Sequence, residues 1–380
     1  MKMIINAVLV MKDHYIPDAV LLIEDGKIVK FGERRLFGDL PDCETIDAKG
    51  LFVGPGLIDI HVHAGGMHNF AENPQAACEV HLKNGTTTLN SAVYFSLDRQ
   101  GFVNEINFLK KAMKDPACEN LQGLYMEGPY MNPKFGANRE QNPWHGVVNK
   151  ADFEPIVEAG IDVVKVWALA PERENILEFV QYVKAKNPAA IFAVGHSEAA
   201  PHETEALMPY GLRIGTHHTN ATGSLPKYPE CRGVCVDETV SYNREIYAEL
   251  ICDSRGIHVD PYMLRLVRRI KGDDRVILIS DACVDYGPTP PGYDGVTDIN
   301  FDFMGEISGS KLTLNVACRN MMKHTGASIC DVFRFASYNP SRATNLLDRG
   351  EIAVGNRADL IFVDHDMNVH GVFMNGIQKI

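Results

Sequence analysis

Eight short apolar runs, most of them separated by segments of helical length, constrain the fold of this 380-residue chain more than any other feature. Such runs are typical of buried parallel strands, because helical crossovers cover both faces of a parallel sheet. The runs are Leu57–Val62, Thr87–Leu89, Leu121–Met126, Val163–Leu169, Ile191–Val194, Arg213–Thr216, Ala248–Cys252 and Val276–Ser280. They predict an α/β fold, a (β/α)8 TIM barrel, over residues 55–346.

The two ends of the chain have a different pattern from the middle. Strand-like residues 20–24 and 27–30 flank Asp25-Gly26, a hairpin signal because both turn positions tolerate positive φ. Further strands are expected at 352–354, 358–363 and 372–374, which Gly-Asn and Asn-Gly pairs separate. We therefore predict one small β-sandwich domain built from residues 1–54 and 347–380.

Composition excludes several classes of partner. The net charge is −12 and no Lys/Arg run stands out, so a nucleic-acid partner is not expected. No window reaches the ~20 apolar residues of a membrane span, and the N-terminus lacks the pattern of a signal peptide. The nine cysteines are odd in number and scattered, which favours reduced thiols and a cytoplasmic location.

Ionisable residues follow the apolar runs at the positions where barrel enzymes carry their chemistry. They are His61 and His63 after the first run, Glu127 after the third, His196 after the fifth, His217 after the sixth and Asp281 after the eighth. The carboxyl ends of barrel strands meet at one face, and residues two apart in a strand share a side. Imidazoles and carboxylates gathered there predict a site for zinc, iron or another divalent transition metal.

This set of residues can hydrolyse an amide of a small polar substrate. A divalent metal lowers the pKa of a bound water toward ~7 and polarises a carbonyl. The Asp281 carboxylate could accept the proton of that water and pass it to the departing amine. We find no nucleophilic Ser or Cys with a convincing context, so the sequence favours metal-assisted hydrolysis.

Nearly the whole chain resembles the amidohydrolase superfamily, and within it the N-acetylglucosamine-6-phosphate deacetylases. The resemblance is carried by the strand-end residues above and by longer motifs. These are Met126-Glu127-Gly128-Pro129, Gly195-His196-Ser197, Thr216-His217-His218-Thr219-Asn220-Ala221, Ile257-His258-Val259 and Gly355-Asn356-Arg357-Ala358-Asp359.

The resemblance implies roles for named residues. Glu127, His196 and His217 resemble the metal ligands, and His61 with His63 implies a second metal bridged by Glu127. Asp281 resembles the catalytic carboxylate. Asn220, Ala221 and His258 resemble contacts to an N-acetyl amino sugar phosphate, and the family implies a homodimer.

Two substrate contacts of the family are altered here. The histidine that usually follows the Glu-Gly-Pro loop is Asn138 in Gly136-Ala137-Asn138, and His145 is a candidate replacement. The usual phosphate-binding arginine is matched only by Arg232 in Pro229-Glu230-Cys231-Arg232-Gly233, with Lys227 and Arg139 in reserve.

Two other functions fit the pattern less well. A cyclic-amide hydrolase or N-acyl amino acid deacylase would use a carboxylated lysine as bridging ligand, and Lys165 in the fourth run is the candidate. Glu127 already supplies a bridge, however. A non-enzymatic ligand-binding protein would be favoured by loss of the catalytic carboxylate, and Asp281 is present.

Overall fold

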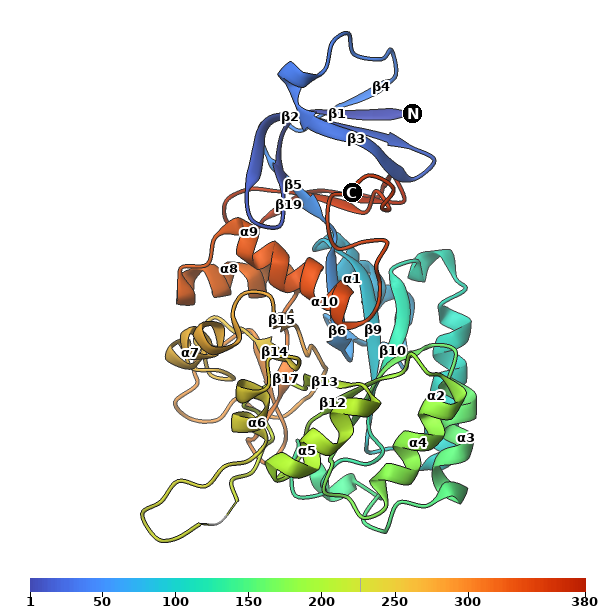
Figure 1. The fold of residues 1–380 in the computed structure, drawn as a ribbon, viewed down its shortest axis with the longest axis vertical. Coiled ribbons are helices and arrows are strands. Elements are labelled where there is room, and N and C mark those ends of the chain that lie inside the picture. Colours follow the sequence, from blue (N-terminus) through green and yellow to red (C-terminus); the bar gives the residue numbers. More distant parts are fainter. Residues whose placement is uncertain (226) are drawn as a thin grey trace.

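The computed structural model describes residues 1–225 and 227–380, and a parallel barrel forms its centre (Figure 1). Eight strands hydrogen-bond in the reverse of chain order, from β15 to β6. The strands are β6 (Leu57–Val62), β9 (Thr86–Tyr94), β10 (Leu121–Glu127), β11 (Val164–Leu169), β12 (Ile191–Val194), β13 (Leu212–Gly215), β14 (Tyr247–Ile251) and β15 (Val276–Ile279). Each predicted run forms one of these strands, so the predicted barrel is confirmed.

The barrel closes at the carboxyl ends of its first and last strands. β6 and β15 lie at opposite ends of the hydrogen-bonded order. Just beyond β15, Asp281 N donates to His61 O at 3.0 Å, and His63 N donates to Ala282 O at 2.8 Å. This closure places the residues that follow β15 against the two histidines at the end of β6.

Helices connect the strands and cover the outside of the barrel (Figure 1). In α7, Leu264 and Val267 are buried, and the Asp260 side chain caps the helix by accepting from Tyr262 N at 2.7 Å. The helices are α1 (Pro74–Lys83), α2 (Arg99–Ala112), α3 (Lys150–Gly160), α4 (Ile176–Lys186), α5 (Pro201–Leu207), α6 (Val236–Tyr242), α7 (Pro261–Lys271), α8 (Leu314–Thr325), α9 (Ile329–Phe333) and α10 (Asn339–Ala343). Within the described residues, every helix is too short or too polar to span a membrane.

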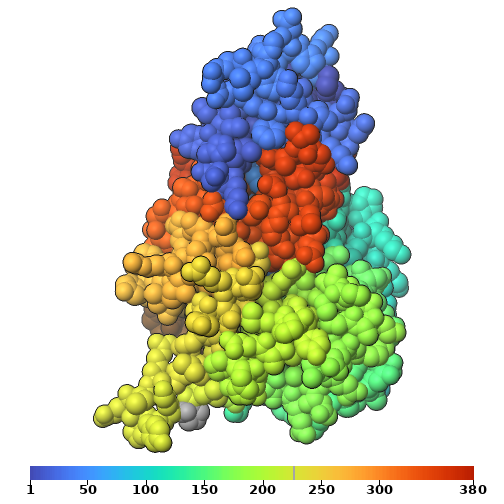
Figure 2. Space-filling view, in the orientation of Figure 1, coloured from blue at the N-terminus to red at the C-terminus, as the bar shows by residue number. Residues whose placement is uncertain are grey.

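Both chain ends build one eight-stranded sheet beside the barrel, as the blue and red segments at the top of Figure 2 show. Its strands are β1 (Lys2–Val10), β2 (Tyr15–Glu24), β3 (Lys27–Glu33), β4 (Glu44–Asp47), β5 (Phe52–Pro55), β18 (Leu360–Val363), β19 (Val369–Met374) and β20 (Ile377–Gln378). The two ends meet where β5 pairs with both β1 and β18. A core of its own, which includes Leu9, Leu21, Leu360 and Phe373, is enclosed by these strands.

The local predictions for this domain were right at the turn between β2 and β3 and wrong at one later segment. Asp25 and Gly26 have φ of 48° and 74° between β2 and β3, as the hairpin prediction requires. The expected strand at 352–354 is instead a loop, in which Gly355 N donates to Ile28 O at 2.8 Å. Ile352 is buried in the domain core, so its apolar character reflects packing and not strand pairing.

Two short hairpins complete the carboxyl face of the barrel. β7 (Ala64–Gly65) pairs with β8 (His68–Asn69) after the first barrel strand. β16 (Ile299–Phe301) pairs with β17 (Ile307–Ser310) after the last. Ser310 N donates to Asp281 O at 2.8 Å, so the second hairpin holds the backbone that follows β15.

Candidate active site

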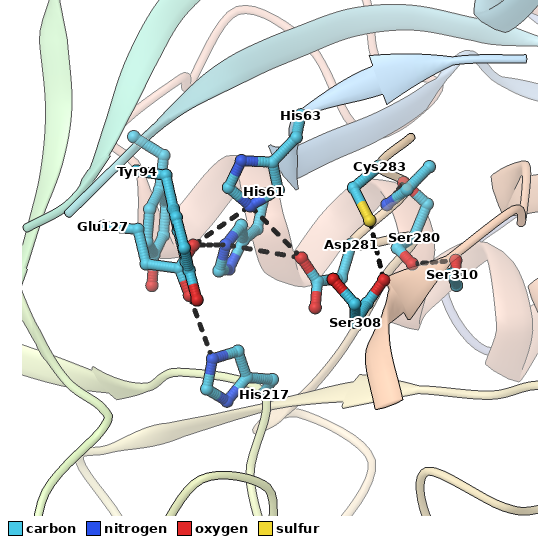
Figure 3. A network of polar contacts seen from close by, with 12 residues as sticks. His61, His63, Tyr94, Glu127, His217, Ser280, Asp281, Cys283, Ser308 and Ser310 are labelled. Atoms are coloured by element: carbon cyan, nitrogen blue, oxygen red, sulfur yellow. Dashed lines mark hydrogen bonds and ion pairs between the residues drawn. The ribbon is translucent and has the colours of Figure 1, made fainter. Parts of the chain in front are cut away.

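Glu127, the last residue of β10, lies between two pairs of histidines at the carboxyl face of the barrel. Figure 3 shows it with His61, His63 and His217. Its Oε1 is 2.7 Å from His196 Nε2 and 3.1 Å from His217 Nε2. Its Oε2 is 3.0 Å from His63 Nε2 and 3.4 Å from His61 Nε2. Each carboxylate oxygen therefore serves a different histidine pair, which is the arrangement of a bridging ligand.

The donor set fits two divalent cations. His61, His63 and Glu127 offer ligand atoms within 4.8 Å of one another, and so do Glu127, His196 and His217. His61 Nε2 and Glu127 Oε2 are buried without a hydrogen-bond partner in the described part of the chain. His196 Nε2 and His217 Nε2 face each other at 3.0 Å. Imidazole nitrogens and a carboxylate that converge in this way satisfy a transition metal better than they satisfy one another.

Burial and charge act in opposite directions on these groups. Burial alone would raise the pKa of the Glu127 carboxyl, but the surrounding histidines hold it well below its ordinary value. Burial alone would lower the pKa of the His63 imidazole, but Asp281 and Glu127 raise it to about 9. Burial lowers the pKa of His196. The cluster thus keeps its carboxylates ionised at neutral pH, as metal binding requires.

Asp281 follows β15 and faces the first histidine pair. Its Oδ1 is 3.4 Å from His63 Nε2 and 3.7 Å from His61 Nε2. Burial alone would raise the pKa of this carboxyl, but His63 and then His61 lower it. The carboxylate is therefore available as a proton acceptor beside the ligand cluster.

Three of the strand-end residues have a backbone conformation that side-chain-bearing residues rarely adopt. The φ angles are 46° at His196, 29° at His217 and 46° at Asp281. Such conformations cost about 1–3 kcal/mol each and concentrate at functional sites. All three residues line the cavity at the barrel mouth.

A cavity of about 560 Å³ opens onto the cluster. Of the residues assigned to substrate by resemblance, Asn138, Asn220, Ala221 and His258 line it. His258 Nδ1 is 3.2 Å from Asp253 Oδ2, which leaves Nε2 of His258 directed away from that carboxylate. The volume suits a small polar molecule such as a monosaccharide derivative.

The structure does not bring His145 or Arg232 to this cavity within one chain. His145 is exposed. The neighbouring Trp144 side chain is the one that is buried, and it donates from Nε1 to Leu97 O at 2.7 Å. The Arg232 side chain is 85% exposed and pairs with Glu238 on α6. Its segment, yellow in Figure 2, projects from the body of the molecule. Neither residue therefore lines the cavity of its own chain, and their contact with substrate stays a prediction.

Two cationic residues do line the cavity, and both are already paired with carboxylates. Arg139 forms a bidentate pair with Glu306, in which Nη2 donates to Oε1 at 3.0 Å. Lys134 pairs with Glu198. The positive charges of these two residues are therefore largely neutralised by their carboxylate partners.

Lys165 lies away from the ligand cluster. It is the second residue of β11, far from the carboxyl end of the strand at Leu169. Its aliphatic chain packs over Gly123, where an added Cβ would lie 2.5 Å from Lys165 Cγ. This position does not support a carboxylated lysine bridge.

Sequence reasoning missed two polar residues of the site. Glu249 in β14 is 0% exposed and contacts His61. A lone carboxylate inside a buried apolar strand was the signal that could have identified it. Tyr94, the last residue of β9, lines the cavity and donates its hydroxyl to Ala137 O at 2.9 Å. No sequence pattern marked it.

The amidohydrolase family model matches residues 52–378, so the chain belongs to the amidohydrolase family. This family is metal-dependent, in agreement with the His/Glu groups.

The chain is also similar over most of its length to sugar-phosphate deacetylases, at 25–27% identity. The chain is 27% identical to the N-acetylglucosamine-6-phosphate deacetylase of Lysinibacillus sphaericus, with 93% of this chain and 91% of the relative covered. It is 25% identical to the N-acetylgalactosamine-6-phosphate deacetylase of Escherichia coli O157:H7, with 85% and 86% covered. The crystal structure of the N-acetylglucosamine-6-phosphate deacetylase from Pasteurella multocida superposes with a TM-score of 0.85 at 24% identity, over 100% of this chain and 99% of that one. The last similarity establishes the fold.

Proposed function

We propose that this chain hydrolyses the acetamide of an N-acetyl amino sugar 6-phosphate and releases acetate and the free amine. The observation that carries the proposal is Glu127, which lies between two histidine pairs with Asp281 Oδ1 3.4 Å from His63. The names of the relatives identify the amide: both deacetylases act on a 6-phosphorylated N-acetylhexosamine.

In the proposed mechanism, two divalent ions, zinc or iron, would be held by His61, His63, Glu127, His196 and His217. When bound, these ions supply an acidified water and an electrophile for the amide carbonyl. Asp281 Oδ1 accepts the proton of the attacking water and returns it to the departing nitrogen, which would otherwise leave as an unstable anion. His258, Asn220 and Ala221 orient the sugar in the cavity.

Phosphate recognition is proposed to require two copies of the chain. Arg232 projects from its own barrel, and a charge-assisted bond from an arginine suits a phosphate. A homodimer would allow the segment of one copy to reach the cavity of the other. Size-exclusion chromatography with light scattering tests the dimer, and a monomer would remove Arg232 from the site.

We also propose a cytoplasmic location for the enzyme. All nine cysteines are free thiols, and six of them are buried. Reduced thiols are typical of a reducing compartment.

A second candidate is deacetylation of an amino sugar that carries no phosphate. The observation that favours it is the pairing of both cavity cations, Lys134 and Arg139, with carboxylates. Asn138, which replaces the histidine of the resemblance, donates to Asp285 Oδ2 at 3.3 Å and brings no charge of its own.

One assay separates the two candidates. The metal-loaded enzyme is given N-acetylglucosamine, N-acetylgalactosamine and N-acetylmannosamine, each with and without 6-phosphate, and release of free amine is followed. A kcat/KM at least tenfold higher for a phosphorylated sugar supports the first proposal. Equal values support the second, and no amine from any of the six sugars would overturn both.

A further inference from the structure

Glu249 is a fully buried carboxylate that the proposed reaction does not use. It is the third residue of β14, between the buried Ala248 and Leu250, and is 0% exposed. A carboxylate in the interior is costly unless hydrogen-bond donors satisfy it. Its partners therefore indicate what it does.

Three donors converge on one oxygen of Glu249. Oε2 lies 3.3 Å from His61 Nδ1, 3.2 Å from the backbone N of His217 and 3.4 Å from the hydroxyl of Tyr125. Tyr125 also stacks on His61, with ring centroids 4.2 Å apart and an interplanar angle of 16°. The imidazole of His61 is thus held at its edge by Glu249 and on its face by Tyr125.

The contact with Glu249 determines the tautomer of His61. Oε2 of Glu249 also accepts from His217 N and from the Tyr125 hydroxyl, so it is the acceptor in this contact and Nδ1 of His61 carries the hydrogen. The lone pair of Nε2 then points toward Glu127 Oε2, 3.4 Å away. His63, the other histidine of this pair, has its Nε2 near Glu127 and Asp281, and its side chain is 16% exposed.

We propose that Glu249 is the positioning residue of the His61–His63–Glu127 metal position: it fixes the tautomer and the ring orientation of His61. The inference rests on the two-metal reading of the proposed function. It predicts that Glu249 controls the occupancy of this position more than that of the Glu127–His196–His217 position. Partners of this kind typically change metal affinity about 10–100-fold.

The test measures zinc binding alone. Metal-free full-length protein is titrated with Zn²⁺ in competition with a chromophoric chelator, and the bound metal is counted by elemental analysis. We expect E249L to weaken one of two zinc positions about 10–100-fold and to leave the other within about threefold. E249Q keeps an acceptor oxygen but loses the charge, so its effect is expected to be smaller. It also serves as the readout if E249L does not fold.

A double-variant comparison distinguishes positioning of His61 from general loosening of the barrel. If Glu249 acts through His61, then E249L added to H61A should change zinc binding little, because the residues belong to one interaction. D359N is the matched control: Asp359 is also a buried carboxylate, but it lies in the terminal sheet domain, where it accepts from Asn375 N at 2.7 Å. It should bind zinc as the unmodified protein does.

Several results would overturn the inference. They are two zinc positions of unchanged affinity in E249L, equal weakening of both positions, or full additivity with H61A. An unmodified protein that binds a single zinc, unchanged in H61A, would overturn it together with the two-metal reading. A failed sugar screen would not affect it, since no substrate enters the measurement.

Discussion

Replacing Asp281 with asparagine is the most direct test of the proposed mechanism, because the structure predicts that only the chemistry changes. The backbone of Asp281 keeps its two hydrogen bonds, from its N to His61 O and from Ser310 N to its O. Its φ of 46° lies in the left-handed region, which asparagine tolerates better than most residues. D281N should therefore fold normally.

The expected loss of turnover follows from the proton that Asp281 is proposed to carry. General acid–base groups contribute typically ~10²–10⁴-fold, so kcat should fall by that factor, or about 2.7–5.4 kcal/mol in activation free energy at ~1.36 kcal/mol per tenfold. Glu127 and the four histidines are unchanged, and zinc should remain bound.

The assay is amine release at saturating sugar, with zinc counted in the same samples. D285N is the matched control, because Asp285 lines the same cavity four residues later and contacts Asn138, outside the ligand cluster. D285N should retain kcat within about tenfold, a smaller loss than general acid–base catalysis supplies. A zinc-loaded D281N with a kcat near that of the unmodified enzyme would remove Asp281 from the mechanism. An equal loss in D285N would show that the assay reports a disturbed cavity.

Three more outcomes are expected. H61A should bind one zinc where the unmodified protein binds two, and an unchanged count would show that His61 is not a ligand. R232A should raise KM for the 6-phosphorylated sugar well above its effect on the unphosphorylated one; equal effects would exclude phosphate recognition by Arg232. Asp253 accepts from Ile257 N at 2.9 Å and from His258 N at 2.8 Å. Burial alone would raise the pKa of the Asp253 carboxyl. Its hydrogen bonds, of which the one from the His258 side chain has the largest effect, lower this pKa below its ordinary value of 3.8. The stabilisation that ionised Asp253 gives the folded state is therefore present above pH 3.8, and it is lost as the pH falls through the lowered pKa. D253N should reduce the free energy of unfolding by about 2 kcal/mol at pH 7. The difference in unfolding free energy between D253N and the unmodified protein should become smaller in acid, as denaturant melts at several pH values would show.

The fold and the metal cluster could be predicted because each depends on a local pattern. The apolar runs mark strands that are buried on both faces, and the residue that follows such a strand faces the active side of a barrel. Glu127 and His196 were identified for that reason, and the structure places them 2.7 Å apart. The segment after the sixth strand has no such constraint, and Arg232 within it is directed to solvent.

Glu249 escaped prediction because its importance depends on contacts between strands. It comes from the seventh strand, while its partners His61, Tyr125 and His217 come from the first, the third and the end of the sixth. No sequence spacing links these positions. Only the closed barrel brings them within 3.4 Å of one oxygen.

The charge of the cavity wall is a further property that the sequence alone did not determine. Lys134 and Arg139 are two cationic residues on the loop after β10, and their charge and position alone would suggest that they bind phosphate. In the structure each is engaged by a carboxylate, Glu198 or Glu306. A phosphate that bound Arg139 would have to displace Glu306, and the bidentate pair with that carboxylate opposes the exchange. In the proposed homodimer, Arg232 of a second copy would leave the Arg139–Glu306 pair in place, and it would exchange only its own surface pair with Glu238 for the phosphate. The proposed dimer therefore predicts that phosphate selectivity depends on assembly: loss of the dimer should reduce it more than it reduces the hydrolysis of an unphosphorylated sugar.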